Sequence, residues 1–206
     1  MAHRRRADDA GPFSRVLVTC EHGGNLVPAS FATQFRGRER VLWSHRGWDP
    51  GALELAGAIA ARLPAPMCFA LTTRLLVDLN RSESSPSLMA PWLAELPVAD
   101  RRAIIRDHHR PYRRHVETTI ARLLRARSAR VLHVSVHTFT PVLRGQRRDV
   151  DIGVLFGPAR RFESAAAAEW MDRLREALPR LRIRANQPYL GTDDGLTTHL
   201  RTRHAD

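Results

Sequence analysis

The sequence predicts an α/β fold in which helices cover both faces of a central sheet. Two observations support this fold class. Short and nearly continuous apolar runs, at residues 16–20 and 131–136 for example, are typical of strands that are buried on both faces. Stretches with helical apolar spacing, such as residues 52–63, alternate with these runs along the chain, as the helices of an α/β fold do.

Taken in order, apolar runs predict strands at residues 16–20, 67–71, 75–79, 131–136, 150–156 and 181–185. Helical spacing predicts helices at residues 30–35, 52–63, 100–127, 163–178 and 194–203. Asp49 and Pro50 form a typical N-cap and first-turn pair for the second of these helices. Pro111 is expected to kink or split the third helix, because proline lacks a backbone N–H. Residues 80–97 predict a long loop, which in compact domains is usually functional.

The composition suits one domain that binds small anionic molecules. A chain of 206 residues is a normal size for a single domain with a substantial core. The formal net charge of +12 comes entirely from arginine, and these side chains are scattered through every segment. Since aromatic residues make up only 6% of the chain, it offers neither a basic patch nor a set of stacking rings for bases. We therefore expect a small anionic substrate and no nucleic-acid partner.

The sequence carries no evident targeting or membrane signal. Residues 1–13 predict a disordered basic N-terminus, and residues 14–206 predict a single domain. No apolar run reaches the roughly 18 residues of a membrane span, so no membrane contact is expected. Cys20 and Cys68 lie in apolar runs, which favours reduced, buried thiols over a disulfide. Together these features predict a cytoplasmic protein.

Polar side chains follow several predicted strands at the point where each strand ends. His22 follows the first strand and His137 the fourth, and carboxyl ends of parallel strands meet at one edge of a sheet. A lone histidine is more often structural, but two that meet at this edge are suited to bind zinc. Two candidates remain for a third ligand. Asn25 has the short spacing from His22 that zinc hydrolases use, and Asp49 has the better chemistry, because an amide oxygen is a weaker zinc ligand than a carboxylate.

A series of short motifs resembles a known family. The run Cys20-Glu21-His22-Gly23-Gly24-Asn25-Leu26-Val27-Pro28 resembles the opening signature of the N-formylglutamate amidohydrolase family, a branch of the zinc carboxypeptidase-like hydrolases. Six further motifs follow in the family's order and cover nearly the whole chain: His45-Arg46-Gly47-Trp48-Asp49-Pro50-Gly51-Ala52, Arg74-Leu75-Leu76-Val77-Asp78-Leu79-Asn80-Arg81-Ser82, Pro111-Tyr112-Arg113, Ser135-Val136-His137-Thr138-Phe139-Thr140-Pro141, Asp151-Ile152-Gly153-Val154-Leu155 and Asn186-Gln187-Pro188-Tyr189.

The resemblance implies a three-layer sandwich with a mixed, mostly parallel central sheet, phosphorylase/hydrolase-like. It also implies metal-dependent hydrolysis of the amide bond of a small N-acyl amino acid, N-formylglutamate-like, with one Zn²⁺ ion as cofactor. In related hydrolases an Asn-Arg pair holds the substrate carboxylate, here Asn80 and Arg81, and another arginine polarises the scissile carbonyl, here Arg74. A guanidinium fork suits both tasks. Arg144 and Arg148 are candidates for binding a second carboxylate, although surface charge on a loop explains them equally well.

One part of the family pattern is not found. The family's general base is a glutamate in a C-terminal strand, and the sequence up to Asp206 contains no matching segment. Glu21 neighbours His22, but consecutive strand residues usually point to opposite faces, so we do not assign Glu21 as the base. The catalytic residues therefore stay unassigned. An alternative function is that of a catalytically silent homologue, which binds an acidic metabolite or partner in the same cleft.

Overall fold

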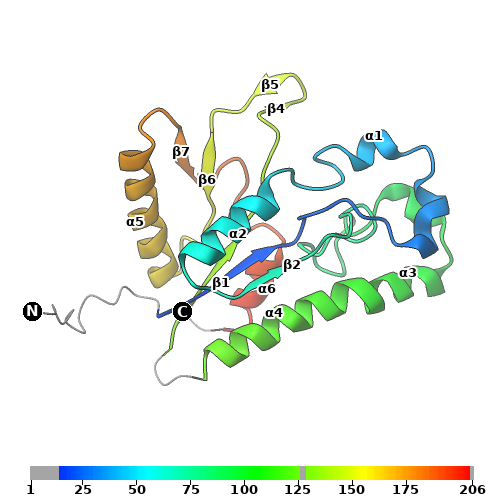
Figure 1. Ribbon diagram of the computed structural model, residues 1–206, viewed down its shortest axis with the longest axis horizontal. Coiled ribbons are helices and arrows are strands. Elements are labelled where there is room, and N and C mark those ends of the chain that lie inside the picture. Colours follow the sequence, from blue (N-terminus) through cyan, green and yellow to red (C-terminus); the bar gives the residue numbers. More distant parts are fainter. Residues whose placement is uncertain (1–13, 126–128, 205–206) are drawn as a thin grey trace, which may run out of the picture.

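The computed structural model confirms the α/β fold class (Figure 1). It describes residues 14–125 and 129–204, so the predicted N-terminal tail, residues 1–13, lies outside the described residues. Helices flank a central sheet, and a smaller pair of strands with its own helix lies beside it. None of the helices within the described ranges combines the length and the apolarity that crossing a bilayer requires.

The central sheet consists of β1 (Arg15–Cys20), β2 (Met67–Phe69) and β3 (Val131–Ser135). The strand order is β2-β1-β3, and both pairings are parallel. All three strands were predicted, each within a few residues of its observed end. Because the strands are parallel, their carboxyl ends lie at one edge of the sheet, and the segments that follow β1 and β3 leave from that edge together.

Helices cover both faces of this sheet, which gives the three layers. Leu17 and Val18 point to opposite faces because side chains alternate along a strand. Leu17 packs in the core cluster that includes residues of α4 (Arg110–Leu123). Val18 packs in the cluster that includes the buried alanines of α2 (Ala52–Arg62). The near-continuous apolarity of β1 is thus explained by burial on both sides.

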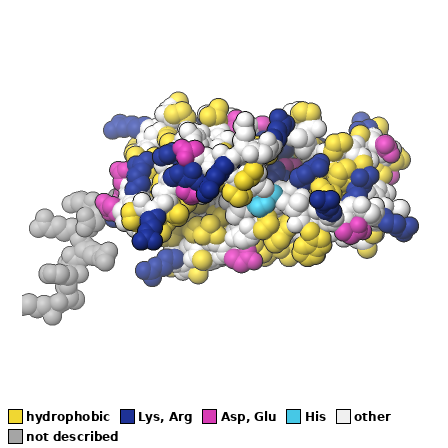
Figure 2. Space-filling model, turned by 90° about the horizontal axis from the view of Figure 1, so that it is seen from above, with side chains coloured by type: hydrophobic (Ala, Val, Ile, Leu, Met, Phe, Trp, Pro, Cys, Tyr) yellow, Lys and Arg dark blue, Asp and Glu magenta, His cyan; other side chains and the backbone are white. Residues whose placement is uncertain are grey.

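The remaining elements lie around this sandwich. β6 (Ile152–Val154) pairs in parallel with β7 (Ile183–Ala185), and α5 (Arg161–Ala177) packs against them through a separate core cluster. Antiparallel pairing is found in the short hairpin of β4 (Val142–Leu143) and β5 (Gln146–Arg147). The short helices are η2 (Ala29–Phe35), α1 (Glu39–Leu42), η3 (Pro91–Glu95) and α6 (Leu196–Arg201). On the face shown in Figure 2, the basic side chains are spread among apolar and acidic ones.

The strand predicted at residues 75–79 does not form. This segment makes turns, with hydrogen bonds from Leu76 N–H to the Thr73 carbonyl and from Asp78 N–H to the Leu88 carbonyl. Its apolar residues are nevertheless buried in the core cluster beneath α4. The apolar run therefore reflects burial, and periodicity alone does not distinguish a buried turn from a buried strand.

The long predicted helix is split, as Pro111 indicated. α3 (Val98–Ile104) leads into a π-helical turn, η4 (Ile105–His109), before α4 begins. The N–H of Arg110 donates to the carbonyl of Ile105, five residues back, in place of the usual α-helical partner. Proline at the next position cannot donate, so the α-helical ladder is interrupted here.

A histidine in β3 makes stability depend on pH. Nε2 of His133 lies 2.9 Å from the hydroxyl oxygen of Thr19, and burial lowers the pKa of His133 from 6.5 to about 4. As pH falls from about 6.5 towards about 4, the unfolded chain takes up a proton that the folded protein does not, so the free energy of unfolding decreases. At about 1.4 kcal/mol per pKa unit, we expect a loss of about 2 to 3 kcal/mol.

This loss is measured by urea denaturation at pH 7.0 and pH 4.5 on the wild type and on His133→Gln. Glutamine retains a polar partner for Thr19 but does not titrate, so the variant is expected to lose less stability than the wild type over this interval. Equal losses in the two proteins would contradict the assignment to His133.

Candidate metal centre

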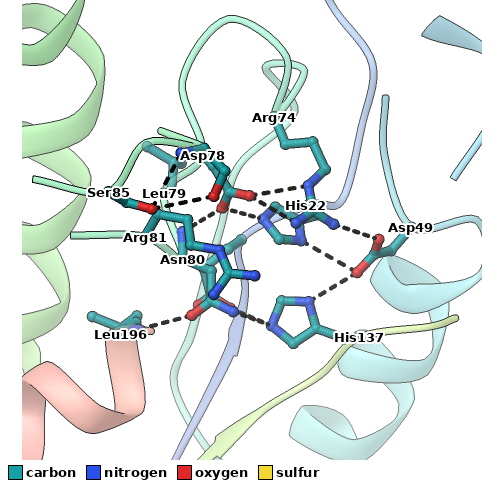
Figure 3. A network of polar contacts seen from close by, with 12 residues as sticks. His22, Asp49, Arg74, Asp78, Leu79, Asn80, Arg81, Ser85, His137 and Leu196 are labelled. Atoms are coloured by element: carbon teal, nitrogen blue, oxygen red, sulfur yellow. Dashed lines mark hydrogen bonds and ion pairs between the residues drawn. The ribbon is translucent and has the colours of Figure 1, made fainter. Parts of the chain in front are cut away.

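Three side chains from three separate segments meet at the carboxyl edge of the sheet (Figure 3). His22 follows β1, Asp49 precedes α2, and His137 follows β3. Each contributes one potential ligand atom, and these atoms all lie within 4.8 Å of one another. The rings of His22 and His137 are 4.8 Å apart between centroids. The structure therefore brings together the two histidines and one of the two alternatives predicted for the third ligand.

The geometry identifies which atoms converge. Nδ1 of His22 is 3.3 Å from Oδ2 of Asp49, and Nδ1 of His137 is 2.8 Å from the same oxygen. The opposite ring nitrogens are held by other carboxylates. Nε2 of His22 is 2.7 Å from Asp78, and Nε2 of His137 is 3.0 Å from Glu21. A carboxylate that accepts the Nε2 proton leaves the Nδ1 lone pair available to a metal, which is the usual arrangement behind ligating histidines.

Asp49 does not cap α2, although its position before the helix suggested that role. The N-cap residue is Gly51, whose backbone has φ +81°, and no side chain caps this end. Asp49 is tied to the site through its backbone instead, because its N–H donates to the carbonyl of His22 at 2.9 Å. Its carboxylate is left free to face the two histidines.

Asn25, the alternative third ligand, has a different partner. Its Nδ2 donates to the backbone carbonyl of Leu42 at 3.3 Å, so the amide fastens the loop to the end of α1. At the neighbouring Gly24, the backbone packs directly against the backbone of Leu71. A Cβ at this position would lie 2.6 Å from the carbonyl oxygen of Leu71, so glycine is required by the neighbouring chain segment. Of the two alternatives, the geometry favours Asp49.

The site holds an excess of buried negative charge. Glu21, Asp49 and Asp78 are each at most 4% exposed. Burial alone raises the pKa of these carboxyl groups, but hydrogen bonds and charges from the two histidines and Arg74 outweigh it and keep each pKa below its ordinary value. Buried carboxylates of this number need positive charge close by.

Arg74 supplies part of that charge. Its Nη1 is 3.4 Å from Oδ1 of Asp49, and its Nη2 is 2.7 Å from Oδ2 of Asp78. This leaves Oδ2 of Asp49 directed at the histidines. The guanidinium is a quarter exposed, and the N–H groups that face neither carboxylate stay available. The structure therefore places Arg74 at the site, with most of its donors already holding the carboxylates.

The pKa of His137 reflects the negative charge of the carboxylates around it. Burial lowers the pKa of His137, but hydrogen bonds and charges from Asp49 and Glu21 outweigh it and raise the pKa to about 10. Without another cation, a proton on His137 would bridge the two acids. His22, Asp49 and His137 could hold a metal ion, and two imidazoles with one carboxylate form a donor set of catalytic zinc sites.

Glu21 has a role at the site that sequence reasoning missed. It lies on the α4 side of β1, as strand alternation predicted, and contacts His137 from there. Its oxygens also accept the hydroxyl of Ser135 at 2.6 Å and that of Tyr112 at 3.0 Å. With its oxygens so engaged, Glu21 orients His137 and is not free to act as a base. One feature of the sequence could have indicated this role: Glu21 ends an apolar run, and a carboxylate that is buried there needs hydrogen-bond donors around it.

The residues predicted to bind substrate divide into two groups. Asn80 lies beside the cluster, with its Nδ2 3.3 Å from Nε2 of His137 (Figure 3). Arg81 follows it in the chain, and its Nη1 donates to the carbonyl of Asp194 at 2.6 Å. Arg144 is exposed at the turn between β4 and β5. Arg148 follows β5, and its guanidinium bonds the hydroxyl of Tyr189 at 3.0 Å. No polar contact among the described residues links Arg144 or Arg148 to the cluster.

Comparison with known proteins identifies the family of the chain. The family model of N-formylglutamate amidohydrolase matches residues 14–206. The crystal structure of gene product Atu2144 from Agrobacterium tumefaciens is similar, with a TM-score of 0.77 and 32% sequence identity over 92% of this chain and 75% of that chain. No curated protein matches the chain. The extent of the family match shows that the chain belongs to the N-formylglutamate amidohydrolase family.

Proposed function

We propose that this protein is a zinc-dependent hydrolase that cleaves the amide bond of a small N-acyl amino acid of the N-formylglutamate type. Membership of the family supports amide hydrolysis. The proposed metal dependence is supported by the convergence of Nδ1 of His22, Nδ1 of His137 and Oδ2 of Asp49. A carboxylate also contacts the opposite nitrogen of each imidazole.

The donor set fits zinc. Zinc prefers nitrogen and carboxylate oxygen ligands, and three protein ligands leave a fourth position open, as in catalytic sites. A bound zinc ion would supply a Lewis acid that activates water and polarises a carbonyl. The chain's own contribution is orientation, because Asp78 and Glu21 fix the two rings and Arg74 fixes the carboxylate of Asp49.

The α-carboxylate of the substrate would be bound by Asn80 and Arg81. A guanidinium and an amide N–H₂ group both donate, and together they suit a carboxylate. The N–H groups of Arg74 that face neither Asp49 nor Asp78 are the nearest further donors for a scissile carbonyl oxygen. The formal net charge of +12 favours encounter with an anionic substrate.

A second candidate, the silent homologue that binds an acidic ligand, is favoured by one observation. Of the described carboxylates, the ones that contact the cluster histidines are Glu21, Asp49 and Asp78, and each accepts hydrogen bonds from histidine, arginine or hydroxyl donors. None is evidently free to take a proton from water. The two candidates differ in turnover and not in binding.

The test is formate release from N-formyl-L-glutamate by the purified protein, first stripped with a chelator and then reloaded with zinc. We expect release that is lost on stripping and restored by zinc. Calorimetric binding of N-formyl-L-glutamate without formate release would support the silent homologue. Absence of both binding and release would overturn the proposed substrate class.

Asp78→Asn tests the orientation of His22 separately. The asparagine cannot hold the Nε2 proton as a carboxylate does, so we expect zinc affinity to fall about 10- to 100-fold. Affinity is measured by competition with a chromophoric chelator. Asp107→Asn, an exposed aspartate paired with Arg106, is the matched control and should bind zinc as the wild type does. Unchanged affinity in Asp78→Asn would show that this carboxylate does not support the ligand.

A further inference from the structure

We propose that residues 194–196, which lead into α6, position the Asn80-Arg81 pair for the substrate carboxylate. The proposal rests on the proposed function and deepens it. Leu196 is 116 residues from Asn80 in sequence, yet its N–H bonds the side chain of Asn80, and the carbonyl of Asp194 bonds Arg81. Gly195, between them, leaves little room for a side chain beside Asn80. These contacts explain how two side chains of a long loop are held in one orientation.

Leu196 fixes which way the side-chain amide of Asn80 faces. The peptide N–H of Leu196 lies 2.8 Å from Oδ1 of Asn80, and since a peptide N–H only donates, the atom that faces it is the oxygen. Nδ2 must then face the metal centre, beside His137. Leu196 is fully buried in the main core cluster, so this donor is firmly placed.

The N–H groups of Asn80 are consequently available to a ligand. Nε2 of His137 lies 3.0 Å from Glu21, and a carboxylate only accepts, so this nitrogen carries a proton and donates it to Glu21. It cannot also accept an N–H from Asn80. The neighbouring Nδ2 therefore presents donors to an incoming oxygen on the same side as the predicted metal ligands.

Asp194 holds the other member of the pair. Its backbone carbonyl accepts Nη1 of Arg81 at 2.6 Å, and its carboxylate accepts the N–H and hydroxyl of Ser82 at 3.1 to 3.2 Å. On the helix side, His109 and Arg113 each donate to the carbonyl of Arg81 at 2.8 Å. The turn is thus clamped between the π-helical region and residues 194–196.

Gly195 offers a clean way to disturb the arrangement. Its φ of −174° is extended backbone that any residue adopts, so alanine adds no backbone strain. A Cβ at this position would lie 3.0 Å from Oδ1 of Asn80, and the amide must shift by a few tenths of an ångström. Gly57, where a Cβ meets nothing within 4 Å, provides the matched glycine-to-alanine control in α2.

The experiment compares Gly195→Ala with Gly57→Ala on two substrates. N-formyl-L-glutamate carries the α-carboxylate, and N-formylisoglutamine carries a carboxamide in its place. For Gly195→Ala we expect the KM for N-formyl-L-glutamate to rise about tenfold, with kcat within about twofold and the KM for N-formylisoglutamine unchanged. Gly57→Ala should resemble the wild type. A merely structural role would lower the active fraction on both substrates and leave each KM unchanged.

A double-mutant cycle ties the effect to Asn80. In an Asn80→Ala background, Gly195→Ala should produce no further rise in KM, because the side chain through which it acts is gone. A rise that persists in this background, or an unchanged KM in Gly195→Ala alone, overturns the positioning role and leaves the proposed function standing. If the wild type binds N-formyl-L-glutamate without turnover, dissociation constants replace KM in the same comparison. A wild type that neither binds nor hydrolyses it overturns both proposals at once, which separates that failure from the others.

A second pair of variants tests the peptide donor itself. Leu196→Pro removes the N–H at the first position of α6, where proline is well tolerated, and Leu196→Ala removes similar packing but keeps the N–H. We expect a KM for N-formyl-L-glutamate several-fold higher in Leu196→Pro than in Leu196→Ala. Equal KM values in two folded variants would overturn the role of the Leu196 N–H.

Discussion

Alanine at position 22 is expected to remove zinc binding and hydrolysis together. His22 supplies one of three ligand atoms, and two remaining ligands hold a zinc ion far less tightly than three. We expect bound zinc to fall from about one ion per chain to less than about a tenth, and kcat/KM to fall by about 10⁴-fold or more. Zinc is measured by elemental analysis after dialysis, and activity by formate release.

Controls separate this loss from unfolding. His22 is 1% exposed and contacts both Asp49 and Asp78, so its removal takes one partner from each of two buried carboxylates, which then keep Arg74. We expect this loss to destabilise the fold by about 3 kcal/mol. His137→Ala should show the same loss of zinc from the opposite side of the site. His115→Ala, at an exposed position of α4, should keep both zinc and activity. Full zinc content in folded His22→Ala and His137→Ala would contradict the ligand assignment.

Alanine at position 81 is expected to remove recognition of the substrate's carboxylate. Loss of charge-assisted hydrogen bonds to an anion costs about 1.5 to 3 kcal/mol, so kcat/KM for N-formyl-L-glutamate should fall about 10- to 100-fold. The carboxamide of N-formylisoglutamine has no charge to lose, and its kcat/KM should change by less than about threefold. Steady-state kinetics on the two substrates measure the difference.

The matched control for this prediction is Arg173→Ala. Arg173 is exposed on α5 and pairs with Glu169 one helical turn away, so its removal lowers the net charge equally without touching the site. It should leave both substrates unaffected. If Arg81→Ala weakened the acid and the carboxamide to the same extent, Arg81 would not be the carboxylate's partner.

The sequence was sufficient to predict that His22 and His137 lie at one edge of the sheet, because each histidine follows the apolar run of its own strand. His22 and His137 each follow a strongly apolar run, and parallel strands bring such ends to one edge. The strand predicted at residues 75–79 was wrong, because an apolar run indicates burial whether or not the backbone pairs as a strand. Residues 75–79 are apolar because they fill the core beneath α4, and no local signal shows that their backbone forms turns.

The contacts that hold Glu21 and Asn80 in place could not be predicted from neighbouring residues in the sequence. Tyr112 and Ser135 meet Glu21 across 91 and 114 residues, and Leu196 meets Asn80 across 116. Such pairs depend on how helices pack on the sheet, which spacing in the sequence does not encode. The role of Asp49 was open because the same position suits capping of a helix and binding of a metal.

The most direct test of the metal centre is anomalous scattering, measured on either side of the zinc absorption edge, from crystals grown with zinc. The account predicts one strong peak within about 2.0 to 2.2 Å of Nδ1 of His22, Nδ1 of His137 and Oδ2 of Asp49. An anomalous peak for zinc at another place in the protein, with no peak between these three atoms, would contradict the proposed metal centre.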